Sequence, residues 1–434
     1  MDTQPRIVLN YVHGDDIGYG RVGAGLAAAL RRRGVEVVDE PGAGGRASPL
    51  PPRVVTWISS PFHAVGCWEQ QRPVVVTMWE TDQLPRSFRR TLRRFTTVIV
   101  PSDENLELFS EFHPDVRRMS FGVDTQRWRP TPRPDGADFV FLCAGSGRRK
   151  GVDLAHDAFM RAFPAGRSTS GPRPRLVLKG RHTDRYAGES VRVITQTLST
   201  DEERAVYDAA HCYVQPSRGE GFGLQPLQAI AAGIPTILTD AHGHRAYSRL
   251  GLPVAARKVP SDLFVFGESG HWWEADLDEL VDAMRWVYEH YDVAIDRAAA
   301  SAADAARTFS WEVAARQLLV ALGGETALAN PLATTGPWRS FGEPVYPIVT
   351  RRDVTIRSAG ADHEFTAGRD TSGPAHVKRL LFESGLLDER CVHVPLRALS
   401  AAERERLTPA QCDEYEAWVA EAKRAPGRDR TATG

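Results

Sequence analysis

Short apolar runs alternate with amphipathic stretches along most of this chain, and they do so in two successive blocks. In the first block the strand-like runs are 6–12, 35–38, 54–58, 74–78 and 97–100, with helical patterns at 21–33 and 86–94. In the second they are 138–144, 175–178, 191–194, 212–215 and 236–239, with helical patterns at 152–162, 200–210, 224–232 and 277–291. Such βαβα alternation is typical of a parallel sheet covered by helices on both faces. The sequence therefore predicts an α/β protein with two doubly wound domains.

A Pro-rich segment at 129–136 separates the two blocks and reads as a linker. We therefore expect domains at 1–130 and 131–330. A third region, 331–434, has alternating patterns at 354–357 and 364–366 and helical patterns at 374–384 and 401–425, which predicts a small α+β appendage with a disordered tail. Two doubly wound domains on a hinge enclose a cleft at the carboxyl ends of their strands, where open α/β sheets bind ligands.

Composition excludes several classes of partner and site. The 54 Lys and Arg residues nearly balance 55 Asp and Glu, so the chain lacks the positive surplus of a nucleic-acid-binding protein. Five scattered cysteines without a CxxC pair favour neither a disulfide framework nor a zinc site. No apolar run reaches the roughly 18–20 residues of a transmembrane segment, and the N-terminus lacks a signal-peptide pattern. We expect a cytoplasmic protein that binds no metal.

The most informative motif is the stretch 215–236, which reads as a strand end, a Gly-rich loop and a helix start. Gly221 and Gly223 allow the backbone to approach a ligand closely. The helix that begins near Leu224 presents unpaired N–H groups, which suit phosphate or sugar oxygens. Glu220 can accept hydrogen bonds from sugar hydroxyls, and Gln228, one turn into the helix, can face the same ligand.

This stretch resembles the EX7E signature of the retaining glycosyltransferases of family 4, which have the two-domain Rossmann-like GT-B fold. In that family the first Glu and the amides after it hold the donor sugar and its diphosphate, and the second Glu binds the ribose hydroxyls. By position Glu220 matches the first Glu, and the amides of Phe222, Gly223 and Leu224 follow it. Gln228 stands in place of the second Glu. An amide binds a ribose hydroxyl without the charge-assisted strength of a carboxylate.

A second motif, 143–154, resembles the family's strand, Gly-Arg turn and Lys-Gly-Val-Asp helix start. The resemblance assigns Lys150 and an Arg to the donor's β-phosphate. Arg148 is the favoured Arg and Arg149 the alternative, because the turn is shorter than usual. Fixed cations stabilise a leaving diphosphate without a metal. The resemblance also places the nucleotide base near 179–181 and 197–199, and so near Lys179 and Leu198.

The segment Gly18–Gly23 has the pattern GxGxxG, which raises an NAD-dependent oxidoreductase as an alternative. In a dinucleotide fold, however, the first Gly directly follows the strand, and here residues 13–17 intervene. The resemblance instead implies a Gly-rich loop in which Gly18 and Gly20 touch the donor phosphates. Glu80 follows the predicted strand 74–78 on the acceptor side. It is a candidate to orient the acceptor hydroxyl or act as a base, with a helix cap or surface acid as the alternative reading.

The sequence thus predicts a retaining, hexosyltransferase-type enzyme without a metal or further cofactor. Its donor is expected to be a UDP- or GDP-linked sugar, and its acceptor (a glycan, lipid, protein or small molecule) is not identified. A catalytically weak nucleotide-sugar-binding protein stays open as an alternative because of Gln228. The central prediction is that Glu220 and Lys150 converge on one bound nucleotide sugar between the lobes.

Overall fold

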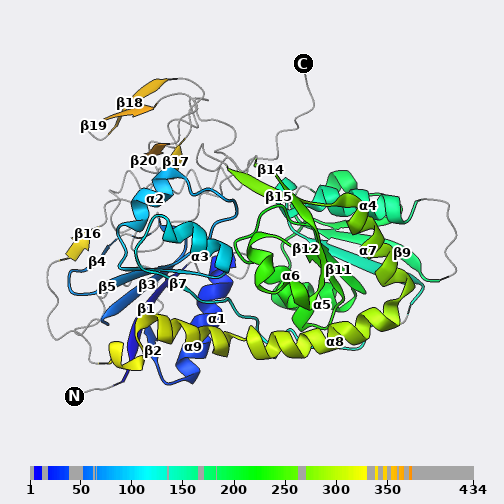
Figure 1. The fold of residues 1–434 in the computed structure, drawn as a ribbon, viewed down its shortest axis with the longest axis horizontal. Coiled ribbons are helices and arrows are strands. Elements are labelled where there is room, and N and C mark those ends of the chain that lie inside the picture. Colours follow the sequence, from blue (N-terminus) through cyan, green and yellow to red (C-terminus); the bar gives the residue numbers. More distant parts are fainter. Residues whose placement is uncertain are drawn as a thin grey trace.

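The computed structural model describes residues 4–11, 18–38, 52–61, 64, 66–133, 136–164, 171–181, 183–261 and 270–329, with short stretches at 338–340, 346–348, 353–358, 361–365 and 371–373. Two lobes lie side by side, each built on a six-stranded sheet (Figure 1). Both sheets are parallel throughout, which confirms the predicted pair of doubly wound domains. Among the described helices, none combines the length and the apolar character that crossing a membrane requires.

The first lobe has the strand order β2-β1-β3-β5-β6-β7. Its strands are β1 (Arg6–Tyr11), β2 (Glu36–Val38), β3 (Val54–Ile58), β5 (Arg72–Val76), β6 (Thr97–Val100) and β7 (Val116–Arg118). Its helices are α1 (Gly18–Arg32), α2 (Arg86–Leu92) and α3 (Asp103–Ser110). Every residue of β3 and β6 is buried, because helices cover a parallel sheet on both faces.

The second lobe has the strand order β10-β9-β8-β11-β12-β13. Its strands are β8 (Asp138–Ala144), β9 (Arg173–Lys179), β10 (Val191–Ile194), β11 (Cys212–Gln215), β12 (Thr236–Thr239) and β13 (Leu252–Val254). Its helices are α4 (Val152–Ala162), α5 (Thr200–Asp208), α6 (Leu224–Ala231) and α7 (Leu277–Glu289). The chain leaves β8 toward one edge and returns to β11 on the other side of β8, so these two strands flank the switch point where open α/β sheets bind ligands.

Two helices that the sequence patterns did not predict return the chain to the first lobe. The long α8 (Tyr291–Thr308) packs along the second lobe against α6, and α9 (Trp311–Leu322) packs against α1 (Figure 1). Backbone hydrogen bonds secure the return, from Val123 N to Phe309 O at 2.7 Å and from Arg6 N to Leu328 O at 3.2 Å. A domain boundary at 330 therefore assigns α9 to the second domain, although its packing is with the first.

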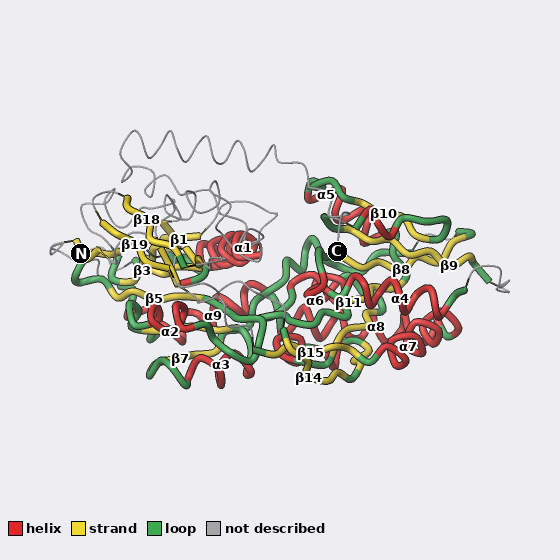
Figure 2. Tube along the Cα trace, turned by 90° about the horizontal axis from the view of Figure 1, so that it is seen from above, coloured by secondary structure: helices red, strands yellow, loops and turns green. Residues whose placement is uncertain are grey.

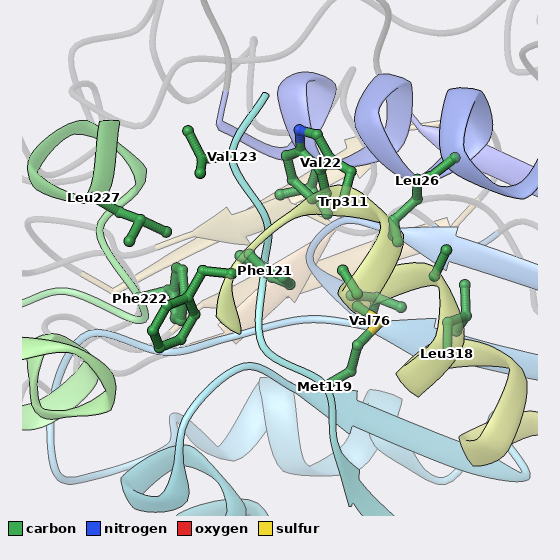
Figure 3. Packing of buried hydrophobic residues seen from close by; sticks show 14 of the residues in the cluster. Val22, Leu26, Val76, Met119, Phe121, Val123, Phe222, Leu227, Trp311 and Leu318 are labelled. Atoms are coloured by element: carbon green, nitrogen blue, oxygen red, sulfur yellow. The ribbon is translucent and has the colours of Figure 1, made fainter. Parts of the chain in front are cut away.

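One hydrophobic core runs through both lobes (Figure 3). It extends from Leu26 on α1 to Leu227 on α6, with Phe121 and Phe222 between them. The rings of Phe121 and Phe222 meet edge to face, with centroids 5.3 Å apart. Phe222 belongs to the predicted donor loop, so its side chain anchors that loop in the packing between the lobes, and only its backbone is available to a ligand.

The prediction that Gly18 and Gly20 lie in a loop is wrong, because both residues are in the first turn of α1. The small size of Gly23 and Gly25, further along the helix, serves packing. A Cβ on Gly23 would lie 2.1 Å from the ring of Tyr11, and one on Gly25 would lie 2.2 Å from the indole of Trp311. Close approach of α1 to its neighbours thus outweighs the cost of about 1 kcal/mol that glycine brings to a helix. In both views α1 lies on the side of the first lobe that faces the second (Figures 1 and 2).

Shorter strands complete the described part of the chain. The pair β14 (Ala256–Pro260) and β15 (His271–Ala275) projects from the second lobe, and β16 (Trp338–Ser340) pairs with β4 (Gly66–Trp68) in the first. Further antiparallel pairs are β17 (Tyr346–Ile348) with β20 (Thr371–Gly373), and β18 (Val354–Ser358) with β19 (Ala361–Phe365). The alternating patterns predicted near 354 and 364 are therefore strands. The helices predicted at 374–384 and 401–425, and the predicted tail, lie outside the described residues.

Candidate functional site

Lys150 and Glu220 meet at the carboxyl edge of the second sheet. Lys150 ends a one-turn helix (Arg148–Lys150) after β8, and Glu220 lies in the loop after β11. Because β8 and β11 are hydrogen-bonded neighbours, the segments that leave them meet at one edge of the sheet. Lys150 Nζ lies 2.5 Å from Glu220 Oε1, and the hydroxyl of Ser217 donates to the same oxygen at 3.0 Å. The predicted approach of these two residues is thus present.

Of the two candidate arginines, Arg149 lies beside this pair and Arg148 points elsewhere. Arg149 Nη1 is 3.6 Å from Glu220 Oε2 and donates to the carbonyl of Gly219 at 2.6 Å. Arg148 Nη2 instead lies 3.9 Å from Glu274 Oε2 on β15, and its side chain is 53% exposed. The side chains of Lys150 and Arg149 are 20% and 26% exposed to solvent, so a ligand can reach both. The geometry therefore favours Arg149 as the partner of Lys150.

Charge balance keeps Glu220 ionised. Burial by itself would raise the pKa of Glu220, but the charges of Lys150 and Arg149 outweigh it and hold that pKa at about 2. Burial also lowers the pKa of Lys150 against the opposing attraction of Glu220. The 2.5 Å contact between the two groups is a charge-assisted hydrogen bond, which stabilises the ionised carboxylate.

A buried arginine that the sequence reading missed braces this site. Arg218 is 3% exposed and forms a two-pronged contact with the carboxylate of Asp153, at 2.8 Å on each side. It also donates to Glu274 at 3.0 Å and to the carbonyl of Arg148 at 2.7 Å. Its own backbone N–H donates to the carbonyl of Arg149 at 2.7 Å. Arg218 thus ties the cationic turn after β8 to the Glu220 loop.

Glu80 approaches the same cluster from the first lobe. A Cβ on Gly219 would lie 2.4 Å from the carbonyl oxygen of Glu80, so the loops of the two lobes touch. Burial raises the pKa of Glu80, while the nearby charges of Arg149 and Lys150 oppose that rise. The cluster therefore brings a carboxyl group of the first lobe to the cations of the second.

Asn105 on α3 links the loop of Trp79 and Glu80 in the first lobe to the Gly-rich loop of the second lobe. The sequence analysis did not predict this residue. Its Oδ1 accepts from Trp79 N at 2.7 Å, and its Nδ2 donates to the carbonyls of Trp79 and Gly221, each at 3.3 Å. From the second lobe, His242 Nε2 lies 2.9 Å from the Trp79 carbonyl. Glu80 thus follows a residue that is hydrogen-bonded from both lobes.

Two of the remaining predicted donor residues, Gln228 and Lys179, lie at a second charged cluster where the two lobes meet. Gln228 on α6 accepts from Arg21 of α1 at 3.4 Å, and Arg21 also donates to Glu203 at 2.7 Å. Lys179, predicted near the base, donates to the other oxygen of Glu203 at 3.1 Å. Glu203 is 3% exposed and was not predicted as a site residue. A buried carboxylate thus joins a cation from each lobe beside Gln228.

The other predicted donor residues do not belong to either charged cluster. Leu198 is half-buried in the segment before α5, and Gly18 is exposed while Gly20 is buried in the first turn of α1. Gly223 adopts a left-handed conformation (φ 90°) and precedes α6, whose first turn has no side-chain cap. Gly221 packs against Met78 of the first lobe. Within the described residues no group of three His, Cys, Asp or Glu side chains has the arrangement of a metal site.

Comparison with known proteins gives a family and a fold. The family described as "Family 4 Glycosyltransferase in conflict systems" matches residues 100–318, just over half of the 434-residue chain. The chain is 36% identical over 114 residues to the D-inositol 3-phosphate glycosyltransferase of Corynebacterium glutamicum (26% of this chain). It is 29% identical over 171 residues to the GDP-mannose-dependent alpha-mannosyltransferase of Mycobacterium tuberculosis (36% of this chain). It spans only 23% and 43% of the lengths of these two relatives.

Among solved structures, Anabaena Alr3699/HepE in complex with UDP-glucose superposes with a TM-score of 0.52 at 12% sequence identity. The superposition covers 74% of this chain and 99% of that one. This likeness shows a shared two-domain fold.

Proposed function

Since the chain belongs to family 4 of the glycosyltransferases, in the group found in conflict systems, we propose that it moves a sugar from a nucleotide-sugar donor to an acceptor hydroxyl. The observation that carries the proposal is the cluster of Lys150, Arg149 and Glu220 at the switch point of the second lobe, facing Glu80 of the first. Two cations beside a carboxylate suit a ligand that joins an anionic diphosphate to a hydroxyl-rich sugar.

In this proposal the donor is a UDP- or GDP-linked sugar, and the reaction retains the anomeric configuration without a metal. The bond between the sugar's anomeric carbon and the diphosphate oxygen breaks, and the acceptor oxygen bonds to that carbon from the same face. The acceptor's proton passes to the departing phosphate. Lys150 and Arg149 stabilise the charge that develops on the diphosphate, because fixed cations need no reorganisation at the moment of reaction.

The other residues position the reactants. Glu220 accepts hydrogen bonds from sugar hydroxyls, and the first turn of α6, which has no side-chain cap, offers N–H groups to the donor. Gln228 lies where the nucleotide's ribose is proposed to bind, and Glu80 orients the acceptor hydroxyl. Contacts between the lobes at Asn105 and Arg21 shield the site from water when it is closed.

Thermal-shift titration of the full chain with UDP, GDP, ADP and NAD tests the binding half of the proposal. A rise in the unfolding temperature with one nucleoside diphosphate, and none with NAD, supports it. Hydrolysis of the matching nucleotide sugar then tests the catalytic half, with Lys150→Ala expected to reduce the rate by at least about 100-fold. Stabilisation by NAD alone, or equal hydrolysis by both proteins, contradicts the proposal.

Two further experiments test whether the reaction retains the anomeric configuration and whether it proceeds without a metal. NMR of the released sugar or transfer product reports whether the anomeric configuration of the donor is kept. Activity that survives EDTA agrees with a metal-free reaction, and activity that returns only with a divalent cation contradicts it. Gln228→Glu separates an active enzyme from a weak donor-binding protein. If the wild type binds a nucleotide sugar without turning it over and this variant does turn it over, Gln228 has weakened an ancestral activity.

A further inference from the structure

His244 is a buried histidine beside the Gly-rich loop, and the proposed reaction makes no use of it. It lies in the one-turn helix His242–Ala246 after β12 and is 1% exposed. A Cβ on Gly223 would lie 2.7 Å from its Nε2, so the ring lies against the predicted sugar-binding loop. Gly243 N donates to the carbonyl of Glu220 at 3.1 Å, which fixes the turn against the Glu220 loop.

Hydrogen bonding settles which ring nitrogen of His244 carries a hydrogen. Nδ1 lies 3.3 Å from the carbonyl oxygen of Thr239, and because a carbonyl only accepts, Nδ1 is the donor. Burial lowers the pKa of His244 to about 4, so the ring is neutral near pH 7. Nε2 therefore presents a lone pair.

That lone pair is buried without a hydrogen-bond partner among the residues the structure describes. A buried acceptor left unpaired costs free energy, and most such groups in proteins are satisfied. The ring lies against Gly223, and its turn is hydrogen-bonded to Glu220, which places His244 at the edge of the proposed donor site. The group that satisfies Nε2 must donate a hydrogen. A phosphate oxygen or a base carbonyl cannot do so, whereas a sugar hydroxyl can.

We propose that Nε2 of His244 accepts a hydrogen bond from a hydroxyl of the transferred sugar, and that His244 thereby selects which sugar the donor carries. The inference rests on the proposed function and assigns one contact within it. It makes His244 a specificity-determining residue that acts on the sugar and not on the nucleotide.

Isothermal titration of the full chain separates these two halves of the donor. The probes are UDP and GDP, and UDP-glucose and GDP-mannose. For the sugar nucleotide that binds, His244→Phe is expected to raise Kd about tenfold, the usual value of one hydrogen bond that is lost beside a buried partner. Kd for the matching nucleoside diphosphate is expected to stay within about twofold. His244→Gln, whose amide oxygen reaches toward the position of Nε2, is expected to recover part of the loss.

Monodeoxy analogues of the bound sugar identify the hydroxyl. For one analogue the ratio of Kd between His244→Phe and wild type should fall to about 1, because the bonded hydroxyl is already absent. His211→Phe, at a second buried histidine of the same lobe, controls for lost stability and should lower the unfolding temperature without changing either Kd. If His244→Phe weakens the nucleoside diphosphate as much as the sugar nucleotide, or weakens neither, this inference is overturned. If the wild type binds no nucleotide sugar at all, the proposed function itself fails.

Discussion

Arg21 Nη2 lies 2.7 Å from Oε2 of Glu203, and the two residues belong to different lobes. Glu203 is 3% exposed and Arg21 22%, so the pair is largely removed from water. Lys179 holds the second oxygen of Glu203 at 3.1 Å. The first turn of α1 is thereby fixed to α5 of the other lobe, next to Gln228.

Removal of the Arg21 side chain should loosen this contact between the lobes. A double-mutant cycle of Arg21→Ala and Glu203→Gln, read by urea unfolding, is expected to give a coupling free energy of about 1–3 kcal/mol, because the pair is mostly buried. The exposed pair Arg32 and Glu312, which joins α1 to α9, is the control and should give less than about 0.5 kcal/mol. Additive effects at Arg21 and Glu203 would refute the coupling.

Arg149 and Arg148 are adjacent in sequence but are expected to differ sharply in function. Arg149→Ala should lower kcat/KM for sugar transfer by about 100-fold or more, because it removes a cation beside Glu220. Arg148→Ala should change kcat/KM by less than about threefold, because its guanidinium lies near Glu274. Steady-state kinetics with saturating acceptor make the comparison, and a larger loss at Arg148 would show that the turn rearranges when the donor binds.

Arg218 is expected to be needed for stability as well as for the shape of the site. Arg218→Ala leaves the carboxylates of Asp153 and Glu274 without their shared cation and should cost about 3 kcal/mol in urea unfolding. Arg218→Lys keeps the charge but cannot contact both carboxylates and a carbonyl at once, so it should recover only part of that loss. Arg307→Ala, in an exposed pair with Asp304, is the control and should cost less than about 0.5 kcal/mol. Equal stability of Arg218→Lys and wild type would show that the charge alone suffices.

Acid should destabilise the protein in two successive pH windows. Burial lowers the pKa values of His242 and His244 from 6.5 to about 4. As the pH falls, the two histidines therefore take up protons in the unfolded chain at a higher pH than in the folded protein. Stability is therefore expected to be full above about pH 6.5 and to fall until about pH 4, by at most about 3 kcal/mol for each histidine. The pKa of Glu220 is held at about 2 instead of 4.5, so its contribution is lost between those values.

Unfolding midpoints measured from pH 7 to pH 4 in wild type and His244→Gln test the first window. The variant should show a shallower dependence on pH, because one proton-binding group of the unfolded chain is removed. An unchanged slope in His244→Gln would mean that the ring already accepts a proton in the folded protein.

The sequence by itself determined ten of the twelve strands of the two sheets, most of the helices between them and the two motifs of the second lobe, but it did not predict β7, β13, α3, α8 or α9. β3, β6, β8, β10, β11 and β12 begin and end where the apolar runs predicted. Such patterns are local, because a buried parallel strand is a continuous apolar run and a helix repeats its apolar face every three to four residues. The resemblance to family 4 implied the approach of Lys150 to Glu220. The structure gives its physical basis, because the two residues follow strands that are neighbours in the second sheet.

Only the tertiary structure decided which side chains work together. Nothing local distinguishes Arg149 from Arg148, and their different partners, Glu220 and Glu274, come from segments about 70 and 125 residues further along the chain. Asn105, Glu203 and Arg218 carry no local signal of their roles, because their partners lie far from them in the sequence. Helix α1 begins at Gly18, before the predicted helical pattern, and the packing of Gly23 and Gly25 on Tyr11 and Trp311 is visible only in the structure. Each of these outcomes depends on contacts through space, and a sequence pattern carries no record of those contacts.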